Sequence, residues 1–140
     1  MKVDAIMTPS PVTARPSALL REVARLMLDH DVGEIPIVDE GGAPVGVITD
    51  RDIVVRLVAH GQDPTQVAAA DCMTSPPRTV RPDADVKECA ELMMREHIRR
   101  VPVVGEDGRL RGIVALADLE RSNGLRSVKA EVARKVSQPH

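Results

Sequence analysis

An internal repeat is the feature that most constrains how this chain can fold. Shifting the sequence by 66 residues aligns residues 7–53 with residues 73–119 without a gap, and 17 of the 47 aligned positions are identical. Asp52 and Asp118 form one of these identical pairs, and most of the other pairs keep their apolar character. The chain is therefore a tandem duplication, and we expect it to fold as two similar units.

The first part of each copy predicts an extended segment followed by a helix. We expect extended segments at Val12–Ala14 and Thr79–Arg81, each ended by a proline. Ser17 and Asp83 then stand where helix N-caps belong. Apolar residues follow at i, i+3, i+4 and i+7, a spacing that is typical of one face of a helix.

The second part of each copy predicts a hairpin and another helix. IPIV and VPVV have the composition of short strands, and turn-like segments separate them from VGVI and RGIV. A helix is then expected from TDRDIVVRLVAHG in the first copy and, from a weaker pattern, at ALADLERSNG in the second. Gly61 and Gly124 stand where C-terminal caps belong.

These patterns predict an α/β (α+β) fold of two in-register β-α-β-β-α repeats. A single unit of about 60 residues has little interior to bury, so we expect the repeats to pack around a pseudo-twofold axis. We place the first repeat at residues 1–62, a linker at 63–68 and the second repeat at 69–124. Valines recur every four residues in the remaining segment, 125–140, which predicts a short C-terminal helix.

Composition limits the classes of partner. Apolar residues make up 43% of the chain, but it has no Phe, Tyr or Trp, so aliphatic side chains must form the core. The lack of aromatic rings argues against nucleic-acid binding by base stacking. The formal net charge is −2, so no overall field attracts nucleic acid or an acidic membrane. We expect neither as a partner.

Targeting and metal signals are not seen. No stretch approaches the ~20 apolar residues of a transmembrane helix, and the first residues do not read as a signal peptide. Cys72 and Cys89 fit no metal spacing, so we expect free, buried thiols in a cytoplasmic protein. None of the four histidines has metal-ligand spacing from another, although histidines distant in sequence can converge.

The repeats resemble a pair of CBS domains, the arrangement called a Bateman module. The resemblance covers roughly residues 3–122, and small stand-alone proteins of this kind are common in bacteria. It rests on MT with a downstream proline before each first helix, on the IPIV and VPVV strands, and on the endings GVITDRDI and GIVALADL. The last motif is weak alone, but it occurs in register in both repeats.

The resemblance implies that an adenine nucleotide or related adenosyl compound binds in the cleft between the repeats. It implies that Asp52 and Asp118 accept hydrogen bonds from ribose hydroxyls, that Thr49 approaches phosphate, and that Arg100 neutralises phosphate. An ionised carboxylate can accept two adjacent hydroxyl groups, and a helix N-terminus suits phosphate. The candidate ligand-binding residues are Thr8, Val12, Ile35, Pro36, Thr49, Arg51, Asp52, Arg99, Arg100 and Asp118.

Two observations leave alternatives open. Thr49-x-x-Asp52 also matches a helix capping box, although a cap residue can face a nucleotide as well. The second copy has Ala115 in place of Thr49, whereas the first has Glu34 where the second has Arg100. We therefore predict one good site with Thr49 and Asp52 and a second that is weak or empty. Which site receives Arg100 stays open, and the arginines could equally be strand-edge or interface charges.

The resulting hypothesis is a regulatory module without catalysis. AMP, ADP, ATP or S-adenosylmethionine would act as a regulatory ligand, with no cofactor required. Binding would change the packing of the repeats or the contacts of a homodimer, and an effector protein in trans would read that change. The alternative is a ligand-free protein-interaction scaffold on the same fold. An enzyme is disfavoured because no nucleophile–base set is visible.

Overall fold

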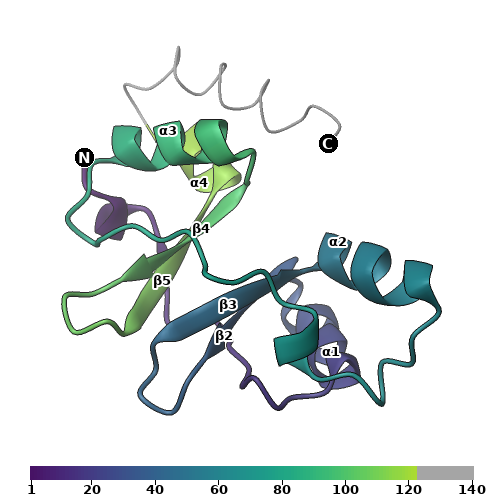
Figure 1. Cartoon of the computed structure of the whole chain (residues 1–140). Coiled ribbons are helices and arrows are strands. Elements are labelled where there is room, and N and C mark those ends of the chain that lie inside the picture. The colour runs from purple at the N-terminus through teal and green to yellow at the C-terminus, as the bar shows by residue number, and fades with distance from the viewer. Residues whose placement is uncertain (123–140) are drawn as a thin grey trace. The chain divides into compact units, whose positions relative to one another are not determined.

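The computed structural model describes residues 1–122, which form two compact units (Figure 1). Unit 1 contains Met1–Ser10, Arg78–Asp107 and the chain from Arg111 onward. Unit 2 contains Pro11–Pro77 and Gly108–Leu110. The expected Gly124 cap and the expected helix at 125–140 lie outside the described residues.

Unit 2 is a two-stranded antiparallel hairpin with helices. Strands β2 and β3 pair with Ile35 opposite Ile48, and helix α1 contacts β2 (Figure 1). The second helix begins as α2 and continues as a π-helical turn at Ile53–Leu57 and a 3₁₀ turn at Val58–His60. The elements are α1 (Leu20–His30), β2 (Glu34–Val38), β3 (Pro44–Thr49) and α2 (Asp50–Asp52).

Unit 1 is built on a three-stranded sheet with the order β1-β5-β4. Helix α3 contacts both β4 and α4 (Figure 1). The elements are β1 (Thr8–Pro9), α3 (Val86–Glu96), β4 (Arg100–Val104), β5 (Leu110–Ala115) and α4 (Leu116–Arg121).

The 66-residue offset also holds in the backbone. Helices α1 and α3 both end at a left-handed residue, Asp31 with φ 52° and His97 with φ 56°. The hairpin turns use Gly42 with φ 85° and Gly108 with φ 82°, where glycine carries no Cβ penalty. The predicted fold class, two in-register repeats of mixed helix and strand, is confirmed.

The N-terminal segment of each repeat joins the hairpin of the other repeat. In unit 1, β1 pairs with β5, and a Cβ added at Gly112 would lie 2.6 Å from the sulfur of Met7. In unit 2, a Cβ added at Gly46 would lie 2.5 Å from the sulfur of Met73, the residue equivalent to Met7. The compact units are therefore not the same segments as the sequence repeats.

Several local predictions need correction. Ser17 and Asp83 are not the helix caps, because α1 follows Leu19 and α3 follows Asp85. The Asp85 carboxylate accepts a hydrogen bond from the backbone N–H of Lys87 at 2.9 Å. In each repeat, the turn that follows the proline continues for two residues past the predicted cap before the helical conformation begins.

The extended segments before the helices are shorter than expected. Each makes one parallel bridge, between Ala14 and Ile37 in unit 2 and between Val80 and Val103 in unit 1. The sequence did not predict β1, which contains only two residues. Gly61 is the predicted C-terminal cap, with φ 66°.

Each unit has its own aliphatic core. Both cysteines are free and buried, as predicted, and burial raises the pKa of the Cys89 thiol to about 12. The largest fully buried side chains of unit 2 are Leu20, Val23, Ile35, Ile37, Ile48 and Leu57. Those of unit 1 are Val3, Met93, Val101, Val103, Val114 and Leu119.

Candidate functional site

Thr49 and Asp52 form a capping box where β3 passes into α2. The Thr49 hydroxyl accepts a hydrogen bond from the backbone N–H of Asp52 at 3.0 Å. In return, Asp52 Oδ2 accepts the backbone N–H of Thr49 at 2.9 Å. The capping interpretation of this motif is therefore correct, and the box fixes the Asp52 side chain at the junction.

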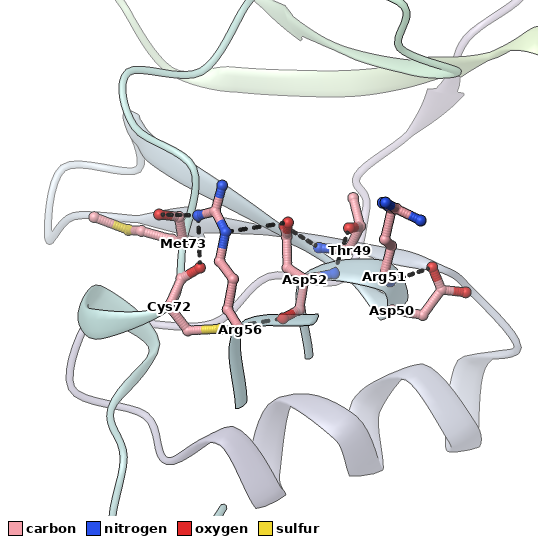
Figure 2. Close-up of polar contacts among 7 residues, drawn as sticks. All are labelled: Thr49, Asp50, Arg51, Asp52, Arg56, Cys72 and Met73. Carbon is pink, nitrogen blue, oxygen red and sulfur yellow. Dashed lines mark hydrogen bonds and ion pairs between the residues drawn. The ribbon is translucent and has the colours of Figure 1, made fainter. Parts of the chain in front are cut away.

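Arg56 holds the second oxygen of the Asp52 carboxylate. Figure 2 shows this carboxylate between Thr49 and the Arg56 guanidinium, whose Nε lies 3.8 Å from Asp52 Oδ1. Arg56 Nη1 also donates to the carbonyl oxygens of Cys72 at 3.1 Å and Met73 at 3.2 Å. Sequence reasoning missed Arg56, although an acid and a base at i and i+4 on a helix are a known pairing signal.

Cys72 lies beside the same cluster. Its thiol donates weakly to the backbone carbonyl of Asp52, with an Sγ–O distance of 3.8 Å (Figure 2). Burial raises the pKa of the Cys72 thiol, and the negative charge of Asp52 raises it further, while Arg56 lowers it. The thiol is thus held in the protonated form at neutral pH and has little nucleophilic character.

Unit 1 repeats this junction with different side chains. Asp118 Oδ2 accepts the backbone N–H of Ala115 at 2.7 Å, and Asp118 Oδ1 pairs with Arg121. Ala115 has no hydroxyl, so only half of the capping box is present. The Asp118 side chain is 8% exposed, compared with 15% for Asp52. The carboxylate of unit 1 is therefore the less accessible one.

The other candidate residues divide between the units. In unit 2, Ile35 and Pro36 are buried in β2, Val12 is half-buried against the core, and Arg51 is exposed on α2. The side chain of Ile35 is fully buried, so it supports the hairpin and offers no surface to a ligand. In unit 1, Thr8 is exposed on β1, Arg99 is exposed just before β4, and Arg100 is half-buried as the first residue of β4.

The charge at the start of the first hairpin strand differs between the units. Glu34 is buried, with 7% exposed, and lies opposite Thr49 in the β2–β3 ladder. Directly opposite residues of an antiparallel pair project from the same face of the sheet. Arg100 takes the equivalent position in unit 1. Unit 2 thus combines two carboxylates, a hydroxyl and Arg56, and unit 1 combines one carboxylate with Arg100 and Arg121.

No group of three or more His, Cys, Asp or Glu residues within residues 1–122 could hold a metal ion. In the same range, no helix is long and apolar enough to cross a membrane.

Both repeats match a known family. The profile of the family described as CBS domain matches residues 3–59 and again residues 69–122. The chain belongs to the CBS-domain family. The match covers both strand–helix junctions, so Asp52 and Asp118 each lie inside a CBS domain.

A relative from Methanopyrus kandleri shows the extent of the sequence likeness. The chain is 40% identical over 108 residues to the uncharacterized protein MK0525 of Methanopyrus kandleri. The alignment covers 77% of this chain and 55% of that protein. The CBS-domain chain thus spans just over half the length of this relative.

Solved structures of other CBS-domain proteins contain adenosyl ligands. The CBS domain protein PAE2072 from Pyrobaculum aerophilum, complexed with AMP, is 31% identical, with a TM-score of 0.82 over 96% of this chain and 99% of that chain. The CBS domain pair of protein MJ0100, in complex with 5′-methylthioadenosine and S-adenosyl-L-methionine, is 32% identical. Its TM-score is 0.79 over 86% of this chain and 94% of that chain.

Proposed function

We propose that this protein is a non-catalytic regulatory module that binds an adenine nucleotide or related adenosyl ligand. The observation that carries the proposal is a fixed carboxylate at the same strand–helix junction of both CBS domains. Related CBS domain pairs contain AMP or S-adenosyl-L-methionine in their solved structures, which supports the same ligand class here. Ligand binding would alter packing or homodimer contacts, and an effector protein would read the change.

The chemistry of Asp52 supports a ribose partner. A carboxylate can accept about four hydrogen bonds, and Asp52 uses one oxygen for the Thr49 N–H and the other for Arg56. Each oxygen therefore keeps lone-pair capacity for one of two adjacent ribose hydroxyls. Because the capping box already orients the carboxylate, little side-chain entropy is lost on binding.

We also propose that the two sites differ. The site of Thr49 and Asp52 is the better one, since its carboxylate is more exposed than that of Asp118. Arg100 belongs to unit 1 with Asp118, so phosphate attraction and the more accessible carboxylate lie in different units. Which of the two sites receives Arg100 stays open.

Thermal unfolding with added ligand tests the proposal. The protein is heated with and without AMP, ADP, ATP or S-adenosylmethionine, and circular dichroism follows the transition because the chain has no aromatic fluorophore. A ligand at 100 times its Kd adds about 2.7 kcal/mol to the free energy of unfolding. We expect such a shift in the wild type, a loss of most of it in Asp52→Asn, and a smaller reduction in Asp118→Asn.

Asp50→Asn is the matched control. Asp50 lies two residues from Asp52 and is exposed, and its carboxylate accepts only the N–H of its neighbour Arg51 among the hydrogen bonds described. The ligand shift should be unchanged in this variant. If none of the four ligands shifts the wild-type transition, the proposed ligand class is wrong.

A ligand-free interaction scaffold is the second candidate. The observation that favours it is that Asp52 and Asp118 already have a backbone donor and an arginine each. Both carboxylates could thus serve the fold alone. This reading expects no ligand-dependent shift and expects binding of a partner protein to survive Asp52→Asn.

A further inference from the structure

Arg56 joins the Asp52 carboxylate to the start of the second repeat. Its Nε faces Asp52 Oδ1 at 3.8 Å, and its Nη1 donates to the carbonyls of Cys72 and Met73 at 3.1 and 3.2 Å. Figure 2 shows the guanidinium lying between the carboxylate and these two carbonyls. A planar guanidinium with fixed donor directions can hold such partners at once. Movement of the carboxylate and movement of residues 72–73 are thereby linked through one group.

The segment that Arg56 holds also docks on β3 through other contacts, including the hydrogen bond of 2.7 Å that the adjacent Ser75 hydroxyl donates to the Val45 carbonyl. Thr74 and Val47 exchange backbone hydrogen bonds of 2.9 and 3.0 Å, and the Met73 side chain lies against Gly46. The thiol of Cys72 contacts the Asp52 carbonyl. Residues 72–74 therefore dock on the middle of β3, the strand whose last residue is Thr49. This segment lies near the start of the second repeat.

We propose that Arg56 is a positioning residue that couples occupancy of Asp52 to the docking of residues 72–74 on β3. The coupling rests on the proposed function for its ligand, because a ribose must engage Asp52. Ribose hydroxyls add hydrogen bonds to the carboxylate and hold it in its capping position. The carboxylate then keeps Arg56 on the two carbonyls, and the docked segment opens less often. By linkage, the ligand must bind the docked form more tightly than the open form, by the same factor by which it suppresses opening.

Unit 1 lacks this arrangement at the equivalent position. Ser122 occupies the place of Arg56, and its hydroxyl donates to the Leu119 carbonyl of the preceding turn at 2.7 Å. The partner of Asp118 is instead Arg121, whose side chain is 71% exposed. The coupling is therefore a property of the first repeat's site.

The labelling rate of Cys72 by a soluble maleimide measures docking of the segment without any ligand. Cys72 is buried, with 3% exposed, so it reacts when the segment opens. Mass spectrometry of peptides separates it from Cys89, which reports global opening of unit 1. We expect Arg56→Met to label at Cys72 at least ten times faster than the wild type, with the Cys89 rate unchanged. Equal Cys72 rates in both proteins would overturn the proposal.

The expected direction excludes a simple charge effect. Arg56 lowers the pKa of the Cys72 thiol, so its removal leaves less thiolate at a given pH and slows the chemical step. Faster labelling must therefore come from opening. Arg21→Met is the matched control, because it removes an exposed arginine from α1 of the same unit, and it should label at the wild-type rate. Arg56→Lys keeps the charge and should fall between, which guards against misfolding of Arg56→Met.

AMP and S-adenosylmethionine are the probes for testing the coupling between ligand binding and docking. A saturating probe that binds should slow Cys72 labelling at least threefold in the wild type and leave Arg56→Met unaffected. Calorimetric titration should show at least threefold weaker binding of that probe to Arg56→Met. Equal affinity and equal protection in the two proteins would overturn the coupling while the proposed function stands. If neither probe binds the wild type, both the proposed function and the coupling to a ligand are wrong. The labelling rates without ligand still test whether Arg56 docks residues 72–74.

Discussion

The two strand–helix junctions share one backbone geometry and differ in the side chains around it. Both aspartates accept the N–H of the last strand residue, at 2.9 Å for Asp52 and 2.7 Å for Asp118. In unit 2 the Thr49 hydroxyl accepts the N–H of Asp52, whereas Ala115 in unit 1 has no hydroxyl to accept the N–H of Asp118. After duplication, the contact that satisfies a backbone donor was kept in both copies, because an unmade hydrogen bond at a half-buried junction is costly.

The differences concern what each junction can bind. Unit 2 has a hydroxyl, an arginine that contacts residues 72–73, and the buried Glu34 opposite Thr49. Unit 1 has Arg100 in the place of Glu34 and a more buried carboxylate. A role in folding thus explains what the two copies share, and the proposed role in ligand binding would explain where they diverge.

The N-terminal segment of each repeat packs against the hairpin of the other repeat, and disturbing this packing gives the largest expected effect on stability. We expect Gly112→Ala to destabilise the protein by about 3 kcal/mol and Gly46→Ala by about 2 kcal/mol, within the usual range for overpacking. An added Cβ would lie 2.7 Å from the Thr8 carbonyl oxygen at Gly112 and 3.0 Å from the Thr74 carbonyl oxygen at Gly46. Urea unfolding followed by circular dichroism measures both values.

Shortening the facing methionine provides a crossed control. Met7→Ala should recover part of the loss in Gly112→Ala and none of the loss in Gly46→Ala, since the Met7 sulfur faces Gly112. Met73→Ala should do the reverse. If shortening the methionine of a glycine's own repeat rescued the glycine variant, the N-terminal segments would not pack on the hairpin of the other repeat.

Removal of the two carboxylates compares the junctions directly. We expect Asp118→Ala to lower the free energy of unfolding by about 2–3 kcal/mol and Asp52→Ala by about 1–2 kcal/mol, in the range for hydrogen bonds to charged groups. Asp118 is the more buried, and its contact with the Ala115 N–H is the shorter. Urea unfolding without ligand is the measurement. An equal or reversed order would show that the exposure of the carboxylates does not set their contribution.

The repeat made the fold predictable from sequence. Seventeen identities at one offset identified equivalent helices, strands and turns, and Gly61 and the Thr49–Asp52 box behave as local rules predict. The helix starts were misplaced, because Ser17 and Asp83 are good caps by residue type, but the turn after the preceding proline continues for two more residues. The residue types at these positions do not show how far the turn continues.

The surroundings of the site were less predictable. Arg56 has the i+4 signal from Asp52, yet its contacts with the carbonyls of Cys72 and Met73 depend on how a segment sixteen residues away folds back. Nothing in the sequence shows that Met7 faces the hairpin of the other repeat. The roles proposed for Arg99 and Arg100 stay predictions, because they concern a ligand.

Exchanging the residues at the cap position sharpens the comparison further. Thr49→Ala should cost about 1 kcal/mol and Ala115→Thr should gain up to about 1 kcal/mol, the usual value of an N-cap hydroxyl. The backbone supports this, since Thr49 and Ala115 have nearly the same conformation, with φ −102° and −99°. Thermal unfolding measures both changes. A destabilising Ala115→Thr would mean that unit 1 has no room for the hydroxyl.

The starts of α1 and α3 differ in their response to acid, which is the smallest expected effect. The hydrogen bond from the Lys87 N–H holds the pKa of the Asp85 carboxyl below its usual value, and the nearby N-terminus and Lys2 also lower it. A lowered folded pKa means that the stabilisation is complete above the unfolded value of about 3.9 and is lost as the pH falls through the folded pKa. Leu19, the equivalent residue before α1, has no carboxylate.

Asp85→Asn separates this contribution from those of other carboxylates. Asparagine keeps an acceptor for the cap but does not titrate, so the loss of stability between pH 5 and pH 3 should be smaller in Asp85→Asn than in the wild type. The pKa of Asp63 is also lowered, by hydrogen bonds from Thr65, but its effect is present in both proteins and cancels in the difference. Urea midpoints at the two pH values provide the measurement. An identical loss of stability between pH 5 and pH 3 in the two proteins would show that the Asp85 cap contributes nothing to the pH dependence. The starts of α1 and α3 would then not differ in their response to acid.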